Sequence, residues 1–96
     1  MKPSQALQAH REEVRSIILN YRVKNARVFG SVLYGEDTEE SDLDLLVDPT
    51  PETTLMDLGA IRYELRKLLG VSVDVLTPKA LPVNFRERVI KEAQPL

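Results

Sequence analysis

Apolar residues recur at intervals of three and four positions in three segments of the chain, the spacing that places side chains on one face of an α-helix. These segments are residues 4–21, 53–69 and 83–93. Ser4 can cap the start of the first segment. Gly70 is suited to end the second, because glycine readily adopts the left-handed conformation found at helix C-termini. The pattern predicts three amphipathic helices, and a further short helix is expected to begin at 32–34.

Three shorter apolar runs lie between these helical segments, and their length and flanking residues are typical of β-strands. They are residues 26–29, 43–47 and 72–76. Strands that alternate with amphipathic helices form a sheet whose apolar side the helices cover. The order therefore predicts an α/β (α+β) fold with a small mixed sheet of three to four strands flanked by helices.

Two carboxylates interrupt the second apolar run. Asp42 and Asp44 flank Leu43, so in a strand both project from one face with Cβ atoms about 6.5–7 Å apart. Asp74 stands alone among apolar residues in the third run. Like charges this close raise each other's pKa, and a divalent cation that prefers hard oxygen ligands, Mg²⁺ or Mn²⁺, would relieve the repulsion. The pattern indicates a metal site at Asp42 and Asp44 that Asp74 could complete from a neighbouring strand.

A glycine–serine pair follows the first predicted strand. Gly30 has no Cβ, so a phosphate can approach its backbone, and Ser31 can add a hydroxyl donor. If a helix begins here, its positive end would add to the attraction. Either motif alone is most often an ordinary turn or a solvated strand edge. A phosphate-binding turn beside paired carboxylates is instead a layout for phosphoryl transfer, where positioning and charge neutralisation provide most of the catalysis.

Length, charge and cysteine content exclude several kinds of protein and of functional site. The 96 residues are enough for one domain, which we expect to span 1–96. With 13 basic and 15 acidic residues the net charge is −2, which gives no case for direct nucleic-acid or membrane-surface binding. There is no cysteine for a disulfide, a thiolate metal site or a nucleophile, and no apolar run has the length of a membrane span. We expect a cytoplasmic location.

The combination of motifs resembles the minimal nucleotidyltransferase family of the DNA polymerase β superfamily. That family's pattern is Gly-Ser, ten residues, Asp-x-Asp and a third Asp on a later strand, and Gly30, Ser31, Asp42, Asp44 and Asp74 match it. The resemblance implies a polymerase-β-like core in which Asp42 and Asp44 bind two Mg²⁺ ions and Asp74 binds one. It further implies that Asp74 helps activate the attacking hydroxyl and that Gly30 and Ser31 hold the triphosphate of ATP.

The sequence departs from the family pattern directly after the glycine–serine pair. Many relatives carry arginines there, whereas this chain has Val32, Leu33 and Tyr34, followed by an acidic loop over residues 36–40. The departure removes positive charge from the vicinity of the triphosphate. Core or surface packing is the more typical role of a residue such as Tyr34, which could also stack on a base. Arg88 is one of several later cations that could lean toward phosphate, although their spacing does not require it.

The resemblance also implies a partner. The chain ends soon after Asp74, so we expect another protein to supply the acceptor. Minimal family members commonly pair with a HEPN ribonuclease toxin, and the nucleotidyltransferase acts as the antitoxin by transferring AMP to a tyrosine of that toxin. Two other functions stay open. One is a small-molecule nucleotidyltransferase whose acceptor site is completed by another subunit of a homo- or hetero-oligomer, and the other is a non-catalytic antitoxin that acts by binding alone.

Overall fold

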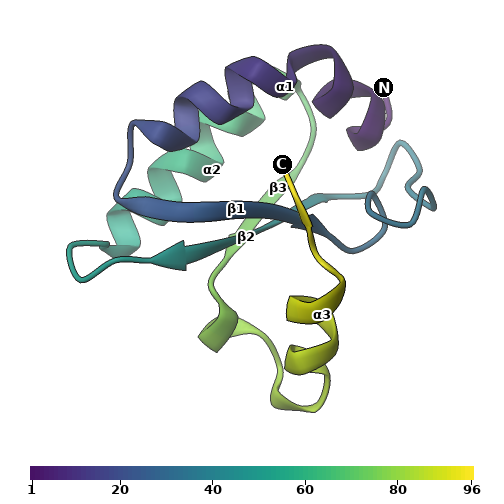
Figure 1. Ribbon diagram of the computed structural model, residues 1–96. Coiled ribbons are helices and arrows are strands. Elements are labelled where there is room, and N and C mark those ends of the chain that lie inside the picture. The colour runs from purple at the N-terminus through teal and green to yellow at the C-terminus, as the bar shows by residue number, and fades with distance from the viewer.

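The computed structural model describes all residues from 1 to 96 and has helices packed on a four-stranded sheet (Figure 1). The helices and strands, in chain order, are α1 (Pro3–Leu19), β1 (Val23–Phe29), β2 (Leu43–Pro49), α2 (Leu55–Leu69), β3 (Val73–Leu76), α3 (Arg86–Glu92) and β4 (Gln94–Pro95). Two short 3₁₀ turns, η1 (Pro78–Ala80) and η2 (Val83–Phe85), lie between β3 and α3. None of the helices is long and apolar enough to cross a membrane.

The sheet is mixed, which confirms the predicted fold class. Its strand order is β3-β2-β1-β4, with β1 antiparallel to both of its neighbours and β2 parallel to β3. Parallel neighbours need a crossover connection, and α2 provides it. The three predicted strands are therefore neighbours in the sheet, with β2 between β1 and β3, and β3 forms one edge.

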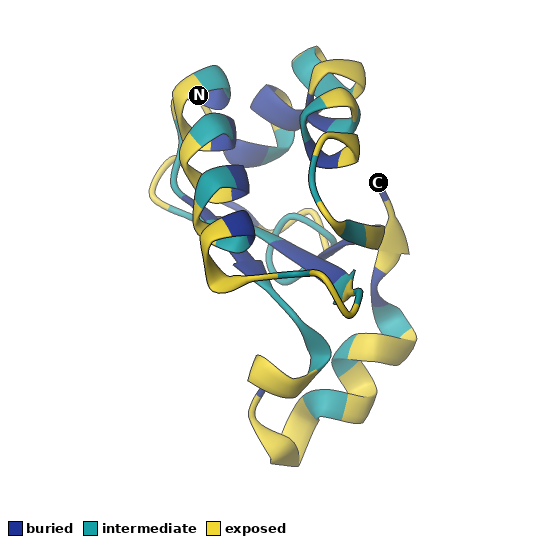
Figure 2. Ribbon diagram, turned by 90° about the vertical axis from the view of Figure 1, so that its left-hand side faces the viewer, coloured by how far each residue is buried: buried dark blue, intermediate teal, exposed yellow.

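The main core lies between the sheet and the helices α1 and α2, which both cover the same face (Figures 1 and 2). Leu43, Leu45 and Val47 point from β2 into this core and are completely buried. Leu46 points to the opposite face, where it packs with Leu81 and Ala93 in a smaller cluster that Val89 of α3 also contacts. The middle of β2 is thus buried on both sides, so its side chains have little freedom to move.

Local signals fix both ends of α2, and the one at its C-terminal end was predicted from the sequence. The Thr54 hydroxyl accepts a hydrogen bond from the Asp57 N–H, and the Asp57 carboxylate accepts one from the Thr54 N–H. This reciprocal arrangement satisfies two amides that a helix start would otherwise leave free. Gly70 ends the helix in the left-handed conformation, with φ of 70°. The expected helix over residues 53–69 is therefore confirmed, with its first helical residue at Leu55.

The first helix begins differently from the prediction. It starts at Pro3, so Ser4 lies inside the first turn instead of capping it. The Ser4 N–H donates instead to the carboxylate of Asp37, at 2.8 Å, from the acidic loop. Burial acts to raise the pKa of Asp37, but the hydrogen bonds from Ser4 and the charge of Lys2 outweigh it and lower that pKa. One member of the acidic loop is therefore buried and anchors the loop to α1.

Three further expectations were wrong in part. Residues 32–34 form successive turns and not a helix. The helix expected over 83–93 is broken, because Phe85 has φ of −132° and ψ of 14°, and only Arg86–Glu92 is α-helical. Two strands are longer than predicted, because β1 begins at Val23 and β2 continues to Pro49, whereas β3 is one residue shorter and begins at Val73. The two-residue strand β4, which pairs with β1, was not predicted at all.

Candidate active site

The three predicted metal-ligating carboxylates lie together at one end of the sheet. Asp44 and Asp74 are direct partners in the parallel register of β2 and β3, and Asp42 immediately precedes β2. One carboxylate oxygen from each of the three lies within 4.8 Å of the other two. Three hard oxygen ligands that converge in this way fit a divalent cation such as Mg²⁺ or Mn²⁺.

Asp44 is the most electrostatically perturbed of the three. It is half-buried, and burial, followed by the charges of Asp74 and then Asp42, raises its pKa from 3.8 to about 6. Both causes act against the ionised form, because low polarity and neighbouring negative charge each make a carboxylate costly. A cation between the three carboxylates would therefore favour the ionised form of Asp44.

The glycine turn lies directly against Asp44. Gly30 has φ of 76°, and a Cβ added there would lie 2.3 Å from Oδ2 of Asp44. Phe29, the last residue of β1, is the register partner of Asp44 across the β1–β2 pair. Only glycine satisfies both the left-handed backbone and the close carboxylate, so the turn and the cluster are parts of one site.

The turn offers free donors to a ligand. The N–H groups of Ser31 and Val32 donate no hydrogen bond within the chain, and the Ser31 hydroxyl makes none. The Gly30 and Ser31 carbonyls accept from Leu33 and Glu36, at 3.0 and 2.9 Å, which holds the turn in shape. Because no helix follows, the affinity of this turn for phosphate rests on individual amides and not on a helix N-terminus. That corrects one part of the expected phosphate-binding arrangement.

Two other acids near the sheet have structural partners. Asp48 accepts from the buried Arg27 at 2.5 Å, and Asp57 is paired with Arg22 at 3.3 Å besides capping α2. Neither lies in the carboxylate cluster. A buried arginine needs such a counter-charge, so Asp48 serves the fold and not the site.

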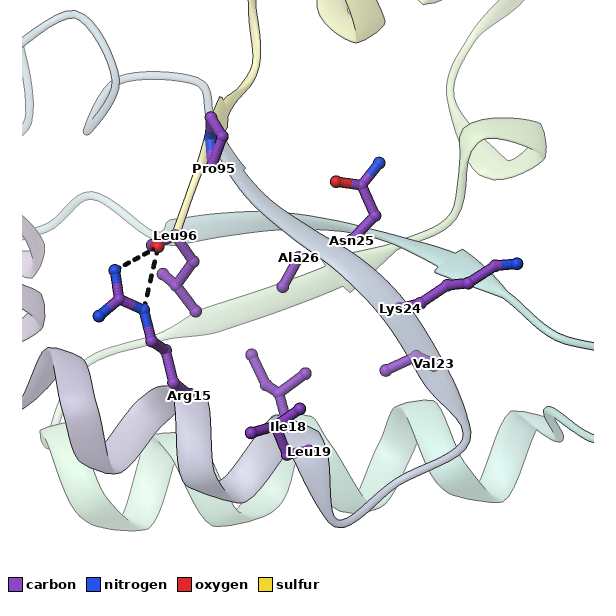
Figure 3. Close-up of a pocket in the computed structure, with 9 residues that line it drawn as sticks. All are labelled: Arg15, Ile18, Leu19, Val23, Lys24, Asn25, Ala26, Pro95 and Leu96. Atoms are coloured by element: carbon purple, nitrogen blue, oxygen red, sulfur yellow. Dashed lines mark hydrogen bonds between the residues drawn. The ribbon is translucent and has the colours of Figure 1, made fainter.

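A cavity of about 220 Å³ lies away from this cluster, between the last turn of α1, β1 and the C-terminal residues (Figure 3). Arg15, Lys24 and Asn25 are the polar residues of its lining, and Nε and Nη2 of Arg15 donate to the backbone oxygen of Leu96 at 3.1 and 2.6 Å. Ile18, Val23 and Ala26 are among its apolar walls. The guanidinium of Arg15 is therefore already engaged, and the cavity contains none of the three clustered carboxylates.

The sequence matches the family of nucleotidyltransferase domains over residues 7–96. A candidate protein adenylyltransferase of Methanocaldococcus jannaschii is 37% identical over 83 residues, which cover 86% of this chain and 89% of that protein. Protein adenylyltransferase MntA of Thermococcus cleftensis is 34% identical over 86 residues, which cover 90% of this chain and 84% of that protein.

Solved structures share the fold. A candidate minimal nucleotidyltransferase superposes with a TM-score of 0.85 at 43% identity, covering 97% of this chain and 95% of that one. A chain of a toxin–antitoxin complex with AMP-PNP gives 0.73 at 15% identity, covering 88% of this chain and 69% of that one. A chain of the MntA–HepT toxin–antitoxin complex gives a TM-score of 0.66 at 13% identity, covering 91% of this chain and 68% of that one. At such low identity the last two are similar in fold alone.

Proposed function

The chain belongs to the nucleotidyltransferase domain family, and from this membership we propose that it transfers AMP from ATP to a hydroxyl group of a partner protein. The proposed partner is a HEPN-family toxin, the acceptor is a tyrosine of that toxin, and the modification silences it. The observation that supports the reaction best is the convergence of Asp42, Asp44 and Asp74 beside the free amides of the Gly30 turn.

In the proposed reaction each part of the site has a separate role. The amides of Ser31 and Val32 hold the triphosphate, and Asp42 and Asp44 would hold two Mg²⁺ ions, one of them shared with Asp74. Bound Mg²⁺ would neutralise the charge of the triphosphate and polarise the reacting phosphate. Asp74 takes the proton of the acceptor hydroxyl as its oxygen bonds to the α-phosphorus. The bond from that phosphorus to the leaving oxygen breaks, and pyrophosphate departs.

The proposed partner rests on two similarities. Relatives that cover most of this chain are named protein adenylyltransferases. Their names support the proposal that the acceptor of this chain is also a protein. The same fold occurs in the MntA–HepT complex of a toxin and an antitoxin. An AMP group on the toxin would add bulk and negative charge, and negative charge repels the phosphates of RNA.

The proposal is tested with the product of the neighbouring gene as acceptor. The two proteins are incubated with ATP and Mg²⁺, and the intact mass of each is measured. We expect the partner to gain one or more AMP groups, and the Asp42→Asn, Asp44→Asn double variant to add none and to fail to protect cells that express the partner. Full protection by a folded double variant, with a partner of unmodified mass, would support the binding-only antitoxin instead. An unmodified partner with the wild-type protein would contradict protein transfer and favour a small-molecule acceptor.

The raised pKa of Asp44 predicts how Mg²⁺ stabilisation depends on pH. The pKa is about 6 in the fold against 3.8 as the ordinary value, so ionised Asp44 destabilises the metal-free protein above pH 6. That destabilisation disappears as the pH falls from about 6 toward 3.8. Mg²⁺ needs the ionised form, so Mg²⁺ should raise the melting temperature more at pH 7.5 than at pH 5.5.

Thermal melts at both pH values, with and without Mg²⁺, check this expectation. Asp44→Asn is the matched variant, because it keeps the shape of the side chain and removes the titrating group. It should melt with little response to Mg²⁺ at either pH. A response to Mg²⁺ that is equal at both pH values, or unchanged in the variant, would contradict the assignment of Asp44 as a ligand.

A further inference from the structure

A cavity of about 230 Å³ lies between the Gly30 turn and the segment that contains η2 and α3. Gly30 itself forms part of its wall, so the cavity opens next to the turn that would hold the triphosphate. Phe29 and Tyr34 line it from the turn side, and Phe85 and Arg88 line it from the opposite side. The sequence patterns did not bring these residues together, because α3 is far from the turn along the chain.

The cavity is on the same face of the sheet as the carboxylates. Phe29 packs on the smaller apolar cluster around Leu46, and Leu46 shares a strand face with Asp44, two positions away. Phe29 is also the register partner of Asp44. A molecule whose phosphates lie between Gly30 and Asp44 therefore has this cavity directly beside it.

The chemistry of the walls suits a flat aromatic ring with an anionic group attached. Phe29, Tyr34 and Phe85 supply aromatic surface on which a base can stack. Arg88 is exposed and has no carboxylate partner within the chain, so its charge is available to an anion. The volume is below the 300 Å³ or so at which pockets for whole drug-sized ligands begin, and suits a single ring system.

The turn and the helix are tied together across the cavity. The Tyr34 hydroxyl donates a hydrogen bond to the Glu92 carboxylate, which links the Gly30 turn to the end of α3. Glu92 also lines the cavity, so a carboxylate that accepts hydrogen bonds stands at its edge. An exocyclic amino group, such as that of adenine, is a matching donor.

We propose that this cavity binds the base of the nucleoside triphosphate, with the ring of Phe85 as a stacking wall; the inference rests on the proposed function. The acceptor is a poorer occupant. Asp74, which would take the acceptor's proton, lies on β3, and β2 separates β3 from β1 and the Gly30 turn. The acceptor thus approaches from the β3 side, while the cavity lies on the β1 side with the phosphates.

Equilibrium binding with Mg²⁺ tests the proposal, using ATP and inorganic tripolyphosphate as the two probes. Tripolyphosphate has the phosphates of ATP but no base. The wild-type protein should bind ATP more tightly than tripolyphosphate, and Phe85→Ala should weaken ATP binding about tenfold while it leaves tripolyphosphate binding unchanged. Phe85→Tyr keeps the ring and should retain the wild-type affinity for ATP.

Ile90→Ala is the matched control. Phe85 and Ile90 are both 38% exposed and both lie in the C-terminal segment, but Ile90 does not line the cavity. This variant should bind both probes as the wild type does. Equal affinity of Phe85→Ala and the wild type for ATP would overturn the base site while the proposed reaction stands. If the wild type bound neither probe, the proposed function would fall, and the base site with it.

Discussion

Replacing Asp74 by asparagine is expected to slow AMP transfer by about 10²–10⁴-fold, the range that general-base assistance contributes. The proposed acceptor hydroxyl loses its proton to this residue, and asparagine cannot take it. ATP should still bind, because Asp42, Asp44 and the Gly30 turn are unchanged. The measurement is the single-turnover rate of partner modification at saturating ATP, together with the affinity for ATP.

The melting temperature of the Asp74→Asn variant without metal shows whether the variant is folded. Asp74 is one of the charges that raise the pKa of Asp44, so its removal relieves repulsion in the metal-free protein. The variant should therefore melt at the wild-type temperature or above it when no metal is present. A transfer rate equal to that of the wild type would contradict the role given to Asp74. A weaker affinity for ATP with an unchanged rate at saturating ATP would make Asp74 a binding residue only.

Replacing Gly30 by alanine should produce the second large loss, about 10²-fold in transfer rate, which is the cost of misplacing reacting groups by about 1 Å. The new methyl group would lie 2.3 Å from Oδ2 of Asp44, much closer than atoms can approach without movement. Asp44 must rotate away or the turn must shift, and either change separates the phosphate donors from the carboxylates. Transfer rate and Mg²⁺-dependent stabilisation are the two measurements.

Gly35→Ala is the control that isolates this clash. Gly35 has φ of 69°, close to the 76° of Gly30, but a Cβ there would meet no atom within 4 Å. Both substitutions therefore carry the strain of a left-handed alanine, and only one touches the site. The Gly35 variant should lose some stability and keep its transfer rate. Equal losses of transfer in the two variants would contradict the claim that the Gly30 turn and Asp44 form one unit.

Much of the fold was predictable because its signals are local. Thr54 and Gly70 mark the ends of α2 by hydrogen bonding and backbone conformation, and both signals are visible in the chain itself. The apolar runs around Leu45 and Val75 predicted buried strands for the same reason. The strand β4 could not be found in this way, since its two residues become a strand only by pairing with β1.

The features of the candidate site also differ in whether a local pattern predicts them. The spacing of Asp42 and Asp44 predicted that they share a face, because strand geometry repeats every two residues. That Asp74 faces Asp44 depends on the parallel register of β2 and β3, which no local pattern specifies. The contact between Gly30 and Asp44, and the position of Phe85 opposite the turn, likewise arise from packing. Sequence spacing can therefore predict the candidate metal ligands of this site, but it cannot predict which residues line the cavity beside them.

The site also joins two parts of the molecule that differ in depth of burial. The middle of β2 is enclosed on both faces, whereas the seven-residue helix α3 has no buried residue (Figure 2). Backbone amides of β2 should exchange with deuterium only when the whole chain unfolds, and those of α3 through local opening at much lower free energy. Such local opening, which must break the hydrogen bond between Tyr34 and Glu92, would move the α3 side of the cavity while Asp44 stays in place. Nucleotide entry and exit by this route would leave the proposed catalytic carboxylates undisturbed.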